Sequence, residues 1–96
     1  MQQITRDSVD AFLNGRKFKR GNMMVENDKM YLHGNIIAWI DINGYLWICD
    51  GGGWQTVTTK DRLNALPNVS IQQKKFVWYL NGERWDGNKT RIGKVR

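Results

Sequence analysis

Hydrophobic positions near the start of the chain follow a helical spacing. Val9, Phe12 and Leu13 fall at i, i+3 and i+4, so they form one apolar stripe. Thr5 is a suitable N-cap for this stripe, because its side-chain oxygen can accept a hydrogen bond from the first turn. Gly15 fits the left-handed position that ends many helices. The sequence therefore predicts a helix that starts near Thr5 and ends before Gly15.

Short apolar or alternating runs separated by turn dipeptides follow this helix. The expected strands are residues 24–26, 29–33, 36–42 and 45–49, with turns at Asn27-Asp28, Gly34-Asn35 and Asn43-Gly44. The last turn is expected to be type I′, with positive φ at both central residues. The nearly continuous apolar character of 36–42 predicts burial on both faces. Together these runs predict an antiparallel meander.

A second helix and a second set of strands follow three glycines. Thr58 or Thr59 is the expected cap of this short helix, and Pro67 ends it. The expected strands are residues 69–73, 76–80 and 83–85, with turns at Lys74-Lys75 and Asn81-Gly82. Residues 1–87 should form one globular domain, and residues 88–96 a mobile basic tail.

The two parts of the chain resemble each other. Thr5, Asp7, Val9 and Ala11 match Thr59, Asp61, Leu63 and Ala65, and residues 31–34 match residues 79–82. Such self-similarity predicts a duplicated α-β-β-β unit, with halves 1–50 and 51–87 that complete one sheet and core. The fold class expected is α+β, a small antiparallel sheet of short hairpins with two short helices.

The charge of the chain is concentrated in two segments. The net charge is +6, and two clusters hold more than half of the cations: Arg16, Lys17, Lys19 and Arg20, then Lys89, Arg91, Lys94 and Arg96. Localised positive charge attracts polyanions such as nucleic acid, nucleotides or an acidic protein face. The alternative is that both segments are solvated and serve only solubility.

Other features of the sequence indicate the cellular compartment of the protein. A single cysteine excludes an intrachain disulfide and fits a reducing compartment. The N-terminal residues lack the apolar region of a signal peptide. The longest apolar run, residues 36–40, is far shorter than a membrane span, which needs about 20 residues. We therefore expect a cytoplasmic protein with no membrane partner.

Several motifs resemble a family of small uncharacterised bacteriophage proteins. They are Tyr31-Leu32-His33-Gly34-Asn35-Ile36-Ile37-Ala38, Gly53-Trp54, Thr58-Thr59-Lys60-Asp61-Arg62-Leu63-Asn64-Ala65-Leu66, Gln73-Lys74-Lys75, Trp78-Tyr79-Leu80-Asn81-Gly82 and Trp85-Asp86-Gly87. The resemblance covers about residues 22–87. It implies a phage origin and expression in an infected bacterial cell, and it supplies no catalytic residues to carry over.

Catalytic and metal chemistry find little support in the residues. His33 and Cys49 are the single histidine and cysteine, too few for a structural zinc site. Cys49 lies in an apolar run, where an inert thiol is the usual finding. The glycines after Asp50 lack the Gly-Lys-Ser/Thr end of a P-loop. We expect neither an enzyme nor a cofactor nor a metal site.

Cations interleaved with aromatic residues suggest where a ligand binds. The expected binding residues are Arg16, Lys17, Phe18, Lys19, Arg20, Trp54, Lys89 and Arg91. In such a set the cations pair with phosphates, while Phe18 or Trp54 stacks on a base. The alternative places Phe18 and Trp54 in the core. Trp39, Trp47 and Trp78, inside expected strands, are assigned to core packing.

These observations leave three functions open. The first is a non-enzymatic phage accessory protein, in host takeover or counter-defence. It would engage nucleic acid or a nucleotide through the basic loop, residues 16–20. The second is an inhibitor that binds and blocks a host protein of a defence system or the transcription machinery. The third is a minor virion or assembly component. A homodimer is a further expected partner state, since association often covers the edges of a small sheet.

Overall fold

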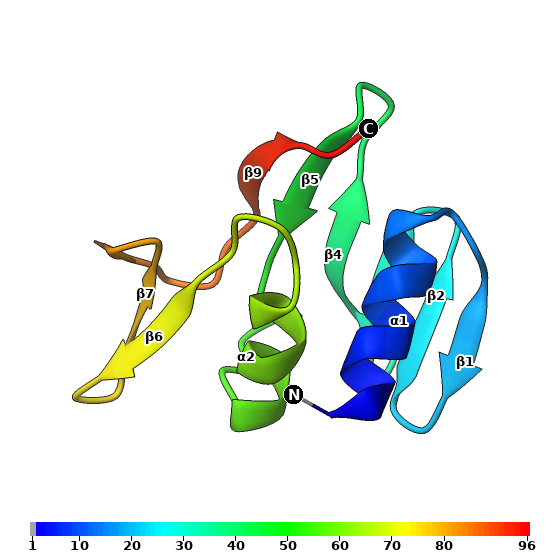
Figure 1. The fold of residues 1–96 in the computed structure, drawn as a ribbon. Helices are drawn as coiled ribbons and strands as arrows, with labels where there is room; N and C mark the ends of the chain where they lie inside the picture. The colour runs from blue at the N-terminus through cyan, green and yellow to red at the C-terminus, as the bar shows by residue number, and fades with distance from the viewer. Residues whose placement is uncertain (1) are drawn as a thin grey trace.

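The computed structural model describes residues 2–96 and confirms the α+β class (Figure 1). The elements are α1 (Gln3–Leu13), β1 (Phe18–Arg20), β2 (Met23–Glu26), β3 (Lys29–Leu32), β4 (Asn35–Ile40), β5 (Tyr45–Ile48), α2 (Val57–Asn64), β6 (Ile71–Lys74), β7 (Val77–Leu80), β8 (Glu83–Arg84) and β9 (Thr90–Lys94). No helix within residues 2–96 combines the length and the hydropathy that crossing a membrane requires.

The strands form two antiparallel sheets where one was expected. The larger sheet has the order β1-β2-β3-β4-β5-β9, and the smaller one β6-β7-β8. Figure 1 shows the smaller sheet projecting beyond α2, while β9 lies beside β5. Strand β9 pairs with β5 in the larger sheet, and the two-residue strand β8 is an edge of the smaller one.

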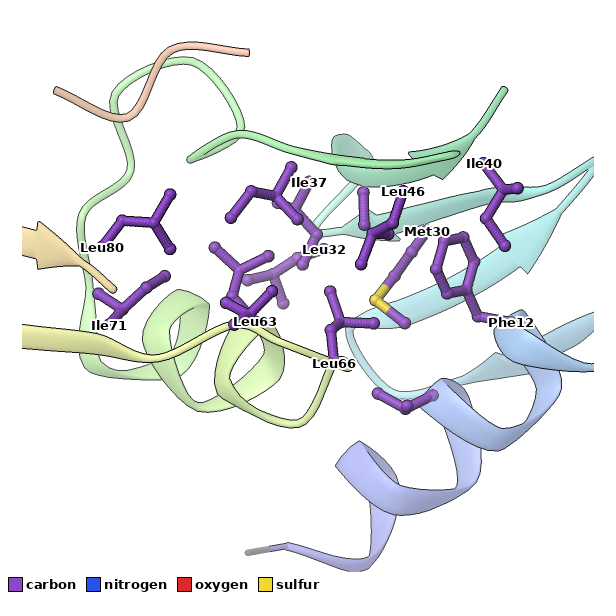
Figure 2. Packing of buried hydrophobic residues seen from close by; sticks show 14 of the residues in the cluster. Phe12, Met30, Leu32, Ile37, Ile40, Leu46, Leu63, Leu66, Ile71 and Leu80 are labelled. Atoms are coloured by element: carbon purple, nitrogen blue, oxygen red, sulfur yellow. The ribbon is translucent and has the colours of Figure 1, made fainter. Parts of the chain in front are cut away.

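A single hydrophobic core joins the two sheets. Both helices lie on the same face of the larger sheet, and their apolar side chains meet those of the strands (Figure 2). Phe12 of α1, Leu63 of α2 and Leu46 of β5 are all fully buried. Trp78 of the smaller sheet is 2% exposed, so the expected core role of Trp78 is confirmed.

The repeat seen in the sequence recurs in the strand pairing. Met23 pairs with Leu32 in the larger sheet, as Ile71 pairs with Leu80 in the smaller one. The turns that follow also match, because His33 (φ 51°) and Asn81 (φ 50°) each precede a glycine with positive φ. The hairpins β2-β3 and β6-β7 therefore share their pairing register and the turn that follows them, although β1 lies between α1 and β2 in the first half.

The N-terminal ends of both helices differ from the expectation. The N-cap of α1 is Gln2, three residues before the expected cap Thr5, and Thr5 is fully buried inside the helix. The N-cap of α2 is Thr56, whose hydroxyl accepts a hydrogen bond from the Thr59 amide at 3.1 Å. The Thr5 hydroxyl instead donates to Asp61 of α2 at 2.6 Å. Thr5, which local capping rules place at the end of α1, therefore makes a contact between the two helices instead.

Three turns also lie one position away from the expectation or differ in type. Of Asn43 and Gly44, only Gly44 has positive φ, so a type I′ turn is wrong here. The Asp41 carboxylate accepts hydrogen bonds from the amides of Asn43 and Tyr45, and this longer turn ends β4 at Ile40. The other two turns have their positive φ values at His33-Gly34 and Lys75-Phe76.

Both basic segments form strands. Residues 18–20 of the expected loop are β1, and residues 90–94 of the expected tail are β9. The prediction that order ends at Gly87 is therefore wrong. Backbone hydrogen bonding to the neighbours β2 and β5 supplies the order that local hydrophobic patterning does not reveal.

Candidate nucleic-acid interface

The larger sheet carries a row of aromatic and basic side chains on the face opposite the helices. Residues directly opposite each other in an antiparallel pair lie on the same face of the sheet. Strand register therefore aligns Glu26, Lys29, Trp39, Trp47 and Arg91 across five strands, and Lys19, Met24, Tyr31 and Ile36 in a second row. We call the face that bears these two rows and Tyr45 the outer face. Every one of these side chains is half-buried or exposed.

Trp39 of β4 and Trp47 of β5 form the centre of the outer face. Their ring centroids are 6.0 Å apart and their planes are inclined by 6°, so the rings are stacked with an offset. Both side chains are half-buried. The expectation that Trp39 and Trp47 pack in the core is therefore wrong. The strands are apolar on both faces, yet the helices cover only one of them.

A hydrogen bond fixes the orientation of Trp47. Its indole N–H donates to the Asp41 carboxylate at 2.8 Å. That bond, together with the amides of Tyr45 and Asn43, lowers the pKa of Asp41 below its ordinary value, with a smaller contribution from the positive charge of Arg91. Asp41 therefore stays charged while it organises the turn and the tryptophan ring.

Cations flank the tryptophan pair on both sides. Lys29 is the cross-strand partner of Trp39, and Arg91 is the partner of Trp47. The Arg91 guanidinium lies over the ring of Tyr45, 4.7 Å from its centroid, a cation–π arrangement that leaves Arg91 exposed. The row thus places a stacked aromatic pair between two positive charges, an arrangement suited to bases and phosphates.

Carboxylates of α1 neutralise much of the positive charge of the expected basic loop. Arg16 forms an ion pair with Asp10, and Arg20 bonds to Asp7 at 2.6 Å, both acids of α1. The hydrogen bond from Arg20, followed by that from Gln3, lowers the pKa of Asp7, which keeps this carboxylate charged.

Two further residues of this loop also have partners on β1 or β2. Lys17 lies 3.7 Å from Glu26. Phe18 is half-buried, with the Arg20 guanidinium 5.0 Å from its ring centroid. In contrast, Lys19 lies on the outer face, opposite Met24.

The two basic segments lie at opposite edges of the larger sheet. Strand β1 carries Lys19 at one edge, and strand β9 carries Arg91 at the other. Adjacent strands lie about 4.8 Å apart, so six strands place these edges roughly 24 Å from each other. The fold does not bring residues 16–20 together with Lys89 and Arg91, but it places the outer face between them.

Trp54 is exposed but lies away from the basic loop. Its side chain is 60% exposed and lines a cavity of about 210 Å³ with Leu32, Ile37 and His33. Leu32 belongs to β3, and β2 lies between β3 and β1. The alternative that Trp54 packs in the core is wrong, and stacking of Trp54 on a base stays a prediction.

A second hollow opens on the outer face beside Trp39. Its volume is about 290 Å³, and its lining residues are Lys29, Ile36, Trp39, Cys49, Gly51, Gly52 and Lys89. Burial raises the pKa of the Cys49 thiol, and the nearby Asp50 charge acts in the same direction. The thiol also donates to the Ile36 carbonyl at 3.1 Å. Cys49 is therefore a weak nucleophile at neutral pH.

Sequence reasoning missed most of this surface. Tyr45-Leu46-Trp47-Ile48 alternates buried and half-buried positions in the structure, but all four residues are apolar or aromatic. A signal was present, since tryptophan and tyrosine at alternate positions of one strand share a face. Within residues 2–96, no group of three or more His, Cys, Asp or Glu side chains is placed to hold a metal ion.

Comparison with known proteins gives the family of the chain. Residues 1–94 match the sequence model of the family described as Kyanoviridae Gp96 protein. No curated protein and no solved structure matches the chain. Because the match spans nearly all of the 96 residues, the chain belongs to the Kyanoviridae Gp96 protein family of cyanophage proteins.

Proposed function

We propose that this phage protein binds single-stranded nucleic acid on its outer face. The observation that carries the proposal is the stacked pair of Trp39 and Trp47, half-buried on a sheet face between Lys29 and Arg91. Aromatic side chains on an open sheet face accept unpaired bases by stacking, and neighbouring cations accept the phosphates.

The balance of charge on this face supports the proposal. The cations on it or at its β9 edge are Lys19, Lys29, Lys89, Arg91 and Lys94. The acids near this face already have partners. Glu26 lies close to Lys17, Asp41 binds the Trp47 indole, and Asp50, beside the hollow, accepts hydrogen bonds from the amides of the glycines that follow it. The face therefore attracts a polyanion more strongly than residues 16–20 do, where Arg16 and Arg20 are paired with carboxylates.

Unpaired bases are a better fit to this surface than a duplex. Stacking on a flat aromatic surface requires that the face of a base be free, and in a duplex those faces are covered by neighbouring bases. A sheet face contributes no helix for insertion into the major groove of a duplex. We therefore expect preference for single strands with little dependence on sequence.

The test is a binding titration with fluorescently labelled single strands of DNA and RNA, and with a duplex of the same sequence, monitored by anisotropy. Trp39→Leu removes a ring yet keeps an apolar side chain, and we expect it to weaken binding about tenfold, in the range found when one stacking residue is removed. Phe76→Leu is the matched control, because Phe76 is 92% exposed and lies in the turn between β6 and β7, away from the larger sheet.

Either of two results would contradict the proposal. One is equal affinity of Trp39→Leu and the unaltered protein for single strands. The other is tighter binding of the duplex than of the single strand. Circular dichroism of each variant verifies that the fold is retained, so that a reduced affinity reports on the interface.

A second candidate function, inhibition of a host protein, is favoured by the β6–β7 turn. Phe76 has φ 66°, a region that bulky residues rarely adopt, and its ring is almost completely exposed. Exposed aromatic residues are frequent anchors in protein interfaces. The test is an affinity pull-down from nuclease-treated host lysate. If inhibition is the function, the unaltered protein and Trp39→Leu will each retain a host protein stoichiometrically, and Phe76→Ser will not.

A further inference from the structure

The hollow beside Trp39 continues the surface of the tryptophan pair. Trp39 belongs to both features: one side of the residue stacks with Trp47, and the residue also lines the hollow. Neighbouring β-strands lie only about 4.8 Å apart. A nucleic-acid chain bound along the tryptophan pair therefore reaches the hollow within about one nucleotide.

The lining of the hollow combines apolar surface, on which a base would rest, with two positively charged side chains. Ile36, Cys49 and Trp39 supply apolar or polarisable surface. The two charged residues of the lining, Lys29 and Lys89, are both exposed and come from β3 and from the segment before β9. Such a hollow fits a planar, uncharged ring attached to a negatively charged backbone.

A glycine loop forms one wall of this hollow, through Gly51 and Gly52. Gly51 has φ 81°, and a Cβ placed there would lie 3.3 Å from side-chain atoms of both Asn35 and Ile37. Gly52, with φ 98°, is held by its amide, which donates to the buried Asp50 carboxylate at 3.1 Å. The loop therefore forms a wall without side chains, which permits close approach of a flat ring.

We infer that the hollow is a pocket for one unstacked nucleobase of the bound strand. This inference rests on the proposed function and deepens it. A base that enters the hollow leaves the stack of its neighbours, while Lys29 and Lys89 hold the phosphates on either side of its sugar. The pocket then anchors the strand, and the tryptophan pair accepts the adjacent base.

Cys49 supplies a direct probe of the pocket. It is the single cysteine of the chain and lines the hollow, so a small thiol reagent such as methyl methanethiosulfonate reacts inside it. The rate of modification is measured by mass spectrometry at one fixed, mildly alkaline pH, because burial raises the pKa of the thiol. It is measured for the free protein, with a single-stranded oligonucleotide, and with an abasic strand of equal length.

The base pocket predicts selective protection. With the oligonucleotide at about ten times its Kd, modification should slow about tenfold, because only the unoccupied fraction reacts. The abasic strand, at the same multiple of its own Kd, should leave the rate nearly unchanged. Conversely, the methylthio-modified protein should bind the oligonucleotide about tenfold more weakly, with recovery after dithiothreitol. Cys49→Ser treated with the reagent is the control for modification elsewhere.

The outcomes separate the pocket from the proposed function. If the oligonucleotide binds and Cys49 reacts at the same rate as in the free protein, the base pocket is wrong and the proposed function stands. Equal protection by the abasic strand also overturns the pocket, because the backbone alone then covers it. If neither strand binds in the anisotropy titration, the proposed function fails, and the base pocket fails with it.

Discussion

Trp39 and Trp47 face each other across β4 and β5 with ring centroids 6.0 Å apart and planes 6° from parallel, on the side of the sheet opposite the buried core. Two large aromatic rings left half-buried on a sheet face forgo part of the hydrophobic stabilisation that burial in the core would give. The hydrogen bond from Trp47 to Asp41 holds one ring in this position. The pair is therefore an ordered surface feature of the fold.

The first prediction concerns the salt dependence of binding. Replacing Lys29 and Arg91 with Gln should reduce the slope of log affinity against log salt concentration by about 0.7 for each phosphate that is no longer neutralised. Replacing Arg16 and Arg20 with Gln should change the slope less, because their charges are paired with acids of α1. A larger change for Arg16 and Arg20 would show that the basic loop is the interface. Titrations at several salt concentrations measure both slopes.

The second prediction concerns pH and Asp41. Its pKa lies below the ordinary value of 3.8 because the Trp47 indole and two backbone amides bond to the charged form. The folded pKa is the lower one, so the stabilisation is present above the unfolded pKa and is lost as pH falls through the folded pKa. The indole N–H resonance of Trp47, followed by NMR, should titrate with a midpoint below 3.8. Asp41→Asn should remove this titration, whereas a midpoint above 3.8 would refute the assignment.

The third prediction concerns the contact between Gly87 and Asp50. The Asp50 amide donates to the Gly87 carbonyl at 2.9 Å, and a Cβ on Gly87 would lie 2.0 Å from Asp50 Oδ2. Gly87→Ala should therefore lower the free energy of unfolding by about 3 kcal/mol, through steric overlap and backbone strain. Gly82 has a similar φ of 89° and no atom within 4 Å of its Cβ position. Gly82→Ala should cost only about 1 kcal/mol. Equal costs in urea denaturation would contradict the steric argument.

The fourth prediction concerns Arg62 of α2, which is 3% exposed and joins this helix to α1 and to the turn between β1 and β2. Its Nη1 donates to Thr5 of α1 at 2.7 Å and to Asp61 at 2.9 Å, and its Nη2 donates to Asn22 at 3.3 Å. Arg62→Ala removes these hydrogen bonds from a buried site and should cost about 3 kcal/mol. Arg6→Ala, at an exposed position of α1, should change stability by less than about 0.5 kcal/mol. Thermal and urea unfolding measure both variants. A small effect of Arg62→Ala would show that the hydrogen bonds of Arg62 contribute little to the contact between α1 and α2.

The fifth prediction concerns the strained turn at Phe76. Phe76→Gly should stabilise the chain by about 1 kcal/mol, because glycine adopts φ 66° without the steric cost that a side chain carries. Ile42 is the matched control, since it is also a fully exposed apolar turn residue but has no positive φ. Ile42→Gly should give no gain in unfolding free energy. If Phe76→Gly destabilises the protein, the ring has a packing role in the fold.

Local patterns in the sequence are enough to predict most of the elements. The stripe of Val9, Phe12 and Leu13 predicts α1, and Asn81-Gly82 predicts a tight turn that has positive φ at both residues. The repeat of residues 31–34 in residues 79–82 predicts the matching strand registers of the two meanders. These features depend on neighbouring residues along the chain, so they are readable without a tertiary structure.

The candidate site was predicted only in part. Lys19, Lys89 and Arg91, which the sequence suggested as binding residues, lie on the outer face or beside it, but the tryptophan pair was assigned to the core. A strand that is apolar on both faces can be buried on both. Its sequence does not show whether a second layer of helices or strands exists to cover the second face. The cations at 16 and 20 looked free because their partners, Asp10 and Asp7, lie on the preceding helix.

The sequence by itself determined the α+β class, the two helices, the hairpins and the repeated unit, because helical spacing, strand alternation and turn residues act over a few positions. The tertiary structure decided which sheet face the helices cover and that residues 18–20 and 90–94 form opposite edges of one sheet. It also decided that Thr5 bonds to Asp61. These outcomes depend on backbone pairing and packing between segments distant in sequence, and no local pattern encodes them.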